Sequence, residues 1–188
     1  MQKLHTIELF AGCGGLLEGF LQQGCYDTLA CVEWEKAPCM TLANRLERKW
    51  HHLYAKNEVI RFDIQRTDEL INGFDDEEYS KHEGLAKLVG SQIVDAIVGG
   101  PPCQAYSLAG RIRDEHGMKE DYRNYLFESY MRIVKYFNSM FFCLQAWRIN
   151  IRNEIMLCPI YHITQNICIS HPLGKTWITY TFFLKIES

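Results

Sequence analysis

A cysteine at position 103 follows a predicted buried strand and a rigid turn. The apolar run Ile93–Val98 is typical of a strand, and Gly99-Gly100-Pro101-Pro102 ends it. Because proline fixes φ, the two prolines would present the next side chain in one direction. Open α/β sheets form their ligand crevices at the carboxyl ends of parallel strands. We therefore interpret Cys103 as a nucleophile, since a structural cysteine would need no such turn.

A glycine-rich turn near the amino terminus predicts a ligand site. The strand-like run Leu4–Leu9 leads into Phe10-Ala11-Gly12-Cys13-Gly14-Gly15, and Leu16–Gln23 has helical character. Glycines in such a turn let backbone N–H groups approach a ligand closely. Leu17 occupies the place of the last glycine of a dinucleotide fingerprint, so the spacing favours a smaller nucleoside ligand. A plain structural turn is the alternative interpretation.

Acidic residues end the next two predicted strands. The strand Thr28–Glu33 ends in Glu33-Trp34, about 20 residues after the glycine turn, where an acid commonly holds a ribose diol. A predicted third strand over Val59–Ile64 carries Asp63 near its end. Asp63 could accept a hydrogen bond from an exocyclic amine. The alternatives are a solvated carboxylate at position 33 and a helix cap at position 63.

Composition narrows the class of protein. The 188 residues fit one domain, and a net charge of −3 does not indicate a nucleic-acid binder, although a local basic patch can serve that purpose. The eight cysteines contain no CxxC pair, which favours free thiols in a reducing cytoplasm. No 18-residue apolar run predicts a membrane span. Neither the acidic cluster at 75–78 nor the pair His51-His52 has the spacing of metal ligands, so we expect no metal site. We expect the acidic cluster to be a solvated helix start and the two histidines to be a surface pair.

The chain beyond Cys103 divides into three parts. A polar segment bearing Ser107, Arg111 and Arg113 is too irregular for a helix or strand, and its arginines suit an anionic backbone such as that of a nucleic acid. An amphipathic helix over 121–137 and a fifth strand over 141–144 follow. Residues 143–188 contain no Val and no Asp, and this change of composition predicts an atypical tail, in which only a strand pair is conceivable.

Two segments of the chain closely resemble signature motifs of DNA (cytosine-5-)-methyltransferases. They are Ile7-Glu8-Leu9-Phe10-Ala11-Gly12-Cys13-Gly14-Gly15-Leu16 and Gly99-Gly100-Pro101-Pro102-Cys103-Gln104-Ala105-Tyr106-Ser107. Asp121-Tyr122-Arg123-Asn124-Tyr125-Leu126-Phe127 resembles the next motif of that family. The resemblance covers about residues 4 to 142.

The resemblance implies an α/β, Rossmann-like fold of the S-adenosylmethionine-dependent methyltransferases. Its sheet would be mostly parallel and incomplete at the carboxyl-terminal end. We expect residues 1–142 to form the cofactor-binding and catalytic part, and residues 143–188 to be a tail of uncertain structure. By the same resemblance, the residues expected to bind S-adenosyl-L-methionine are Phe10, Ala11, Gly12, Cys13, Gly14, Gly15, Glu33, Trp34, Asp63, Ile64 and Gly100.

The family's reaction would use Cys103 to attack C6 of a cytosine flipped out of double-stranded DNA, so that C5 can take a methyl group. The predicted catalytic set is Cys103, Pro102, Gln104, Ser107 and Arg111.

Where the family has Glu-Asn-Val, this chain reads Gln145-Ala146-Trp147, and no target-recognition region follows. Three hypotheses therefore stay open: an active enzyme of a restriction-modification system, an inactive cofactor-binding remnant, and one half of a split enzyme whose partner chain supplies recognition.

Overall fold

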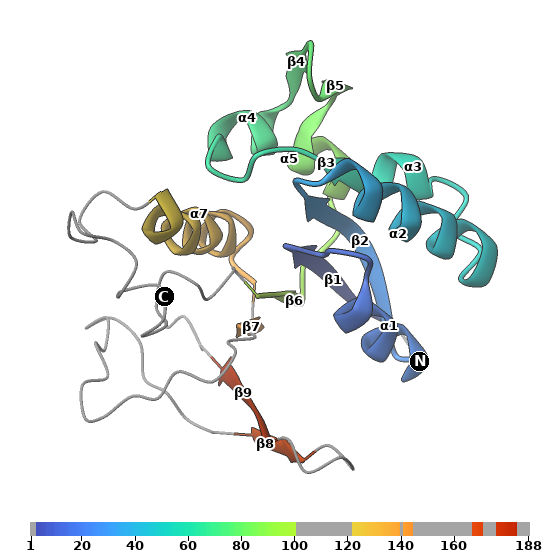
Figure 1. Cartoon of the computed structure of the whole chain (residues 1–188), viewed down its shortest axis with the longest axis vertical. Helices are drawn as coiled ribbons and strands as arrows, with labels where there is room; N and C mark the ends of the chain where they lie inside the picture. Colours follow the sequence, from blue (N-terminus) through green and yellow to red (C-terminus); the bar gives the residue numbers. More distant parts are fainter. Residues whose placement is uncertain (1–2, 101–121, 140, 145–166, 171–175, 184–188) are drawn as a thin grey trace.

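The computed structural model describes residues 3–100, 122–139, 141–144, 167–170 and 176–183 (Figure 1). Within this part of the chain, seven strands form one sheet in the order β3-β2-β1-β6-β7-β9-β8. The first five are parallel to their neighbours, and β9 and β8 are antiparallel. The strands are β1 Leu4–Leu9, β2 Tyr26–Glu33, β3 Val59–Arg61, β6 Ala96–Gly99, β7 Phe141–Leu144, β8 Ile167–Ser170 and β9 Thr176–Phe183.

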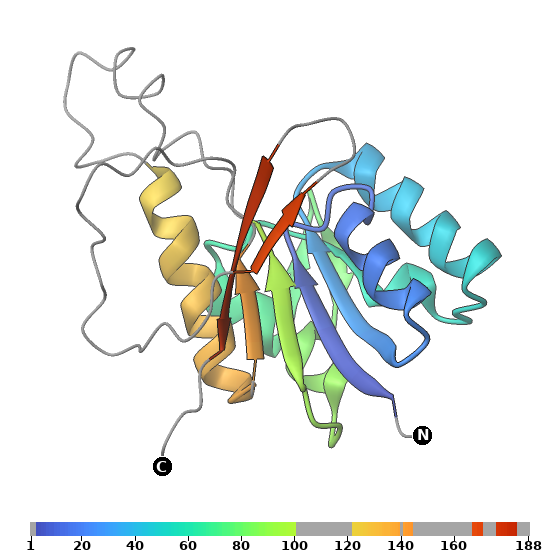
Figure 2. The same cartoon turned by 90° about the horizontal axis from the view of Figure 1, so that it is seen from below.

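Helices cover both faces of this sheet (Figure 2). Helices α1 and α2 pack on one face and α7 packs on the other, together with the short α4 and α5. Side chains of β1 alternate between the two faces: Ile7 and Leu9 enter one core, while Thr6 and Glu8 are buried on the other side. The helices are α1 Gly15–Gln22, α2 Lys36–Lys49, α3 Ala55–Glu58, α4 Thr67–Asn72, α5 Gly84–Val89 and α7 Tyr122–Phe137.

Helix α7 confirms the amphipathic pattern of its sequence. Leu126, Tyr130, Ile133 and Val134 are buried against the sheet, at the spacing of one helical face. The Tyr130 hydroxyl donates a 2.8 Å hydrogen bond to the carbonyl oxygen of Ile97, in the middle of β6. This bond connects α7 to the strand that leads toward Cys103.

The segment predicted to begin a helix at 75–83 forms a hairpin instead, so that prediction is wrong. Its strands are β4 Phe74–Asp76 and β5 Ser80–His82. Phe74 is buried and stacks on Phe62, with ring centroids 3.8 Å apart. The Asp76 carboxylate accepts the backbone N–H groups of Glu78 and Tyr79, which stabilises a turn in place of a helical start.

Two predicted strands start or end elsewhere. The strand predicted from Ile93 begins only at Ala96, because Ile93 is 76% exposed and the Asp95 carboxylate instead accepts the backbone N–H of His5. The third strand ends at Arg61, before Asp63. Two short β-prone runs of the tail, 161–163 and 176–184, made a strand pair conceivable, and the second contains β9, which pairs with both β7 and β8. The short run at 161–163 lies outside the described residues.

No helix in the described ranges is long and apolar enough to cross a membrane. The same part of the chain holds no group of three or more Asp, Glu, His and Cys side chains arranged to bind a metal ion.

Candidate functional site

The predicted cofactor residues gather at one edge of the sheet. Because β1, β2, β3 and β6 are parallel, their carboxyl ends meet there (Figure 2). In the register of these strands, Leu9 lies beside both Val32 and Gly99. The glycine turn follows β1, Glu33 ends β2, Asp63 comes shortly after β3 and Gly100 follows β6. The structure therefore brings together, from four strands, residues that are up to 90 positions apart in the sequence.

Left-handed backbone conformations shape the glycine turn. Phe10, Gly12 and Gly14 have φ angles of 57°, 54° and 78°. A Cβ atom on Gly14 would lie 2.4 Å from Cδ1 of Leu42, so only glycine lets the turn pack against α2. A Cβ on Gly12 or Gly15 would meet no atom within 4 Å. These two positions therefore border open space, where a ligand could approach the backbone.

Glu33 connects the end of β2 to the glycine turn. Its Oε2 atom accepts the backbone N–H of Gly12 at 2.7 Å, and its Oε1 atom accepts those of Trp34 and Glu35 at 2.8 and 2.9 Å. A carboxylate oxygen has two lone pairs, so Oε2 keeps one for a further donor. Position 33 was predicted as a ligand residue, but its bond to Gly12 could not be inferred from sequence.

A second acid, Glu8, lies buried beneath the same turn and was missed by the sequence analysis. Its side chain is on β1 and only 2% exposed, and within the described residues its Oε2 atom has no hydrogen-bond partner. Burial raises the pKa of Glu8 to about 8, the backbone N–H of Leu17 lowers it, and the negative charge of Glu33 raises it further. The sequence signal that could have identified Glu8 is its charge, at a position of the predicted strand Leu4–Leu9 where a side chain would point into the interior.

These acids and the open glycine turn fit S-adenosylmethionine. The cofactor combines a positively charged sulfonium and ammonium with ribose hydroxyl donors. The negative charge of Glu33 attracts a cation, and the remaining acceptor position of its Oε2 atom suits a hydroxyl group. The open space at Gly12 gives such a ligand access to the backbone.

Trp34 and Asp63, which follow β2 and β3 at the same sheet edge, lie in different surroundings. The indole of Trp34 is 54% exposed, and its Nε1 donates to the hydroxyl of Tyr79 at 3.0 Å. The Asp63 Oδ1 atom accepts the backbone N–H of Gln65 at 2.9 Å, so this carboxylate does support the turn before α4. The side chain of Ile64 packs in the core, and its carbonyl oxygen accepts the Thr67 hydroxyl at 2.8 Å.

The predicted catalytic residues Cys103, Pro102, Gln104, Ser107 and Arg111 lie outside the described residues. The described chain reaches Gly100, immediately before the two prolines. A Cβ on Gly99 would lie 2.1 Å from the carbonyl oxygen of Leu9, so this residue must be glycine for β6 to pair closely with β1. The β1–β6 pairing thus brings the segment that precedes Cys103 next to the glycine turn.

Two of the described cysteines are poor candidates for the nucleophile. Cys31 and Cys39 are free and buried. Burial raises the pKa of Cys31 well above its usual range and that of Cys39 to about 12, so neither thiol ionises near neutral pH. Cys31 and Cys39 therefore serve as buried core residues, and neither competes with Cys103 as the predicted nucleophile.

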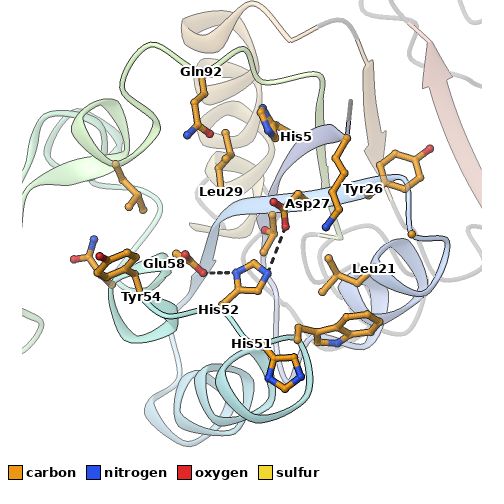
Figure 3. A pocket seen from close by; sticks show the side chains of 16 residues that line it. His5, Leu21, Tyr26, Asp27, Leu29, His51, His52, Tyr54, Glu58 and Gln92 are labelled. Atoms are coloured by element: carbon orange, nitrogen blue, oxygen red, sulfur yellow. Dashed lines mark hydrogen bonds and ion pairs between the residues drawn. The ribbon is translucent and has the colours of Figure 1, made fainter. Parts of the chain in front are cut away.

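A cavity of about 680 Å³ lies at the opposite edge of the sheet, near the amino ends of β1 and β2 (Figure 3). His52 lies in it between two carboxylates: its Nδ1 is 2.6 Å from Glu58 and its Nε2 is 3.5 Å from Asp27. Hydrogen bonding to Glu58 raises the pKa of His52. His52 is therefore half-buried and ion-paired, which corrects the expected surface pair, although His51 is exposed. The cavity contains none of the predicted cofactor residues.

Comparison with known proteins gives matches over most of the chain. The family model described as C-5 cytosine-specific DNA methylase matches residues 4–145. The Type II methyltransferase M.Bpa9945I of Bacillus paralicheniformis is 34% identical over 179 residues, covering 74% of this chain and 40% of that protein. DNA (cytosine-5)-methyltransferase 1 of Gallus gallus is 30% identical over 156 residues, covering 82% of this chain and 9% of that protein.

A solved structure supports the fold. The Entamoeba histolytica methyltransferase EhMeth superposes with a TM-score of 0.62 at 14% identity, covering 98% of this chain and 54% of that chain. At this identity the similarity establishes a fold shared with a methyltransferase. The chain spans less than half the length of each of the two curated relatives named above.

Proposed function

The chain belongs to the C-5 cytosine-specific DNA methylase family, a family of enzymes, and we propose that it takes part in methyl transfer from S-adenosyl-L-methionine to C5 of cytosine in DNA. One observation carries the proposal. Glu33 bonds directly to the glycine turn, at the sheet edge from which β6 leads to Cys103. The proposed cofactor residues and Gly99-Gly100, which precede Cys103 in the sequence, thereby lie at one edge.

Each described residue at this edge has a proposed role. Residues 10–15 would surround the methionine part of the cofactor, and Glu33 would accept the ribose hydroxyls. Trp34, Asp63, Ile64 and Gly100 would border the rest of the cofactor. When bound, S-adenosylmethionine supplies an electrophilic methyl group.

Cys103 would provide the covalent step. Its thiolate adds to C6 of a cytosine flipped out of double-stranded DNA, and the electron density gained at C5 lets this carbon bond to the methyl group. The bond from the methyl group to the sulfonium sulfur breaks, its electron pair goes to that sulfur, and S-adenosylhomocysteine is the leaving group. A proton then leaves C5, the electron pair of that C–H bond restores the double bond, and the thiolate is expelled. Pro102, Gln104, Ser107 and Arg111 remain predicted members of this catalytic set.

We further propose that this chemistry belongs to a restriction-modification system in the cytoplasm, as the similarity to a Type II methyltransferase suggests. A second candidate is a cofactor-binding half that depends on a partner chain for DNA recognition, or an inactive remnant. The observation that favours it is a sequence departure: the chain reads Gln145-Ala146-Trp147 where the family has Glu-Asn-Val.

The first experiment separates these candidates. The chain is incubated with methyl-labelled S-adenosylmethionine and mixed-sequence double-stranded DNA, and label in the DNA is counted. Cofactor binding is measured in parallel by calorimetry. Transfer of label supports the enzyme, and binding without transfer supports the half or the remnant. Failure of both would contradict any cofactor-dependent function for this chain.

Replacing Glu33 by alanine should weaken cofactor binding by roughly 10- to 100-fold, because hydrogen bonds to a charged acceptor are lost at both the ribose and the glycine turn. Calorimetric titration with S-adenosylhomocysteine, the demethylated product, measures this change. Glu35→Ala is the matched control, since Glu35 is exposed and only its backbone N–H contacts Glu33. Equal affinities of Glu33→Ala and the unmodified chain would remove Glu33 from the site.

A further inference from the structure

The hairpin of β4 and β5 has no role in the chemistry proposed above, yet its turn contacts the candidate cofactor site. The hydroxyl of Tyr79, in this turn, accepts the indole Nε1–H of Trp34 at 3.0 Å. The carbonyl oxygen of Trp34 accepts the Nε–H of Arg61 at 3.2 Å. Both the ring and the backbone of Trp34 are therefore held by residues outside its own strand.

Tyr79 is itself fixed from several sides. The Asp76 carboxylate accepts its backbone N–H at 3.2 Å. The Arg61 guanidinium lies over the Tyr79 ring, 5.0 Å from its centroid, and donates to the carbonyl oxygen of Glu78 at 2.8 Å. The buried ring of Phe62 meets Tyr79 edge-on, with centroids 5.1 Å apart. These contacts hold the Tyr79 hydroxyl in place before any ligand arrives.

The indole that Tyr79 holds is placed for contact with a ligand. Trp34 is 54% exposed and directly follows Glu33 at the carboxyl end of β2. Among the described residues, no aromatic ring or cation stacks on it. A flat, exposed ring beside a carboxylate that can accept ribose hydroxyls suits a nucleoside, whose base offers a π-face to an aromatic side chain. An indole held in one rotamer loses less conformational entropy when a base binds than a free one does.

We infer that Tyr79 is a positioning residue for nucleoside binding: its hydroxyl fixes the Trp34 indole in the orientation that receives the adenosine part of the cofactor. This inference rests on the proposed function, because it assumes that the cofactor's nucleoside lies next to Glu33. It assigns a role in the site to the β4–β5 hairpin, which reaches Trp34 from 45 residues further along the chain.

The test is a double-mutant cycle read by calorimetric binding of S-adenosylhomocysteine, with no catalytic turnover involved. Tyr79→Phe removes only the hydroxyl and should weaken binding roughly 3- to 10-fold, the loss expected for one hydrogen bond. The same substitution in a Trp34→Phe background should have no further effect, because the indole through which Tyr79 acts is gone. Tyr54→Phe, on an exposed tyrosine at the opposite edge, is the matched control and should bind as the unmodified chain does.

The outcomes separate this inference from the function on which it rests. Unchanged affinity of Tyr79→Phe, or an equal loss in both backgrounds, would contradict the inference while the unmodified chain still binds. An equal loss would identify Tyr79 as a general structural residue. An unmodified chain that binds no S-adenosylhomocysteine would contradict the cofactor site itself, and the positioning role with it.

Discussion

A Cys103→Ala chain is expected to transfer no methyl label to DNA, a loss of at least roughly 10³-fold relative to the unmodified chain. Without the thiolate, nothing adds to C6 of cytosine, and C5 stays too electron-poor to accept a methyl group. Counting label in DNA measures this effect. Cofactor affinity should stay unchanged, since the residues proposed to bind the cofactor come from the strand ends at the glycine turn and Glu33.

Cys25→Ala is the matched control for this substitution. Cys25 is a free, half-buried cysteine just before β2, at the edge opposite the candidate site, so its loss should leave transfer unchanged. DNA carrying 5-fluorocytosine gives a second measurement. Fluorine cannot leave C5 as a proton does, so the adduct of Cys103 should persist and migrate with the DNA in a denaturing gel. Label transfer by Cys103→Ala, or an adduct formed without Cys103, would refute this assignment.

Replacing Glu8 by glutamine should stabilise the folded chain at pH 7 by about 2–3 kcal/mol. The folded-state pKa of Glu8 is raised from 4.5 to about 8, so at neutral pH folding requires this buried carboxyl to take up a proton. At about 1.4 kcal/mol per pKa unit, this proton uptake lowers the free energy of unfolding by roughly 3 kcal/mol at pH 7. Part of the gain is lost because the buried amide of glutamine also lacks a full set of partners.

The sign of the pH dependence follows from the raised pKa. Glu8 contributes its full stability below pH 4.5, and this contribution falls as pH rises through about 8. Unfolding in urea at pH 4.5, 7 and 8.5 should therefore show little difference between the two chains at pH 4.5 and an increasing advantage of Glu8→Gln above it. His52, whose pKa is also raised, loses stability in the same direction above pH 6.5, but it does so in both chains and cancels in the comparison.

Glu47→Gln, on an exposed glutamate of α2, is the control and should change stability by less than about 0.5 kcal/mol at every pH. Parallel pH profiles for Glu8→Gln and the unmodified chain would contradict a protonated Glu8. Such a result would mean that the charged carboxylate finds hydrogen-bond donors in solution.

Local patterns in the sequence determined most of the sheet and pointed to the family. Alternation and apolar runs located β1, β2 and β6, and helical spacing located α7, because the periods of strands and helices are properties of neighbouring residues. The glycine turn and the segment around Cys103 pointed to the family that the comparison confirms. Since the predicted strands were parallel, the sequence also implied that the two segments share one edge.

Only the tertiary structure decided how the residues at that edge act on one another. The bond from Gly12 to Glu33, the electrostatic interaction of Glu8 with Glu33 and the contact of Tyr79 with Trp34 join residues 21, 25 and 45 positions apart. Strand register, burial and the stacking of Phe62 on Phe74 determine these contacts, and none of them leaves a periodic signal in the chain. The acidic run at 75–78 shows the reason: local composition favoured a helix start, but the segment packs through a buried aromatic pair as a hairpin that reaches Trp34.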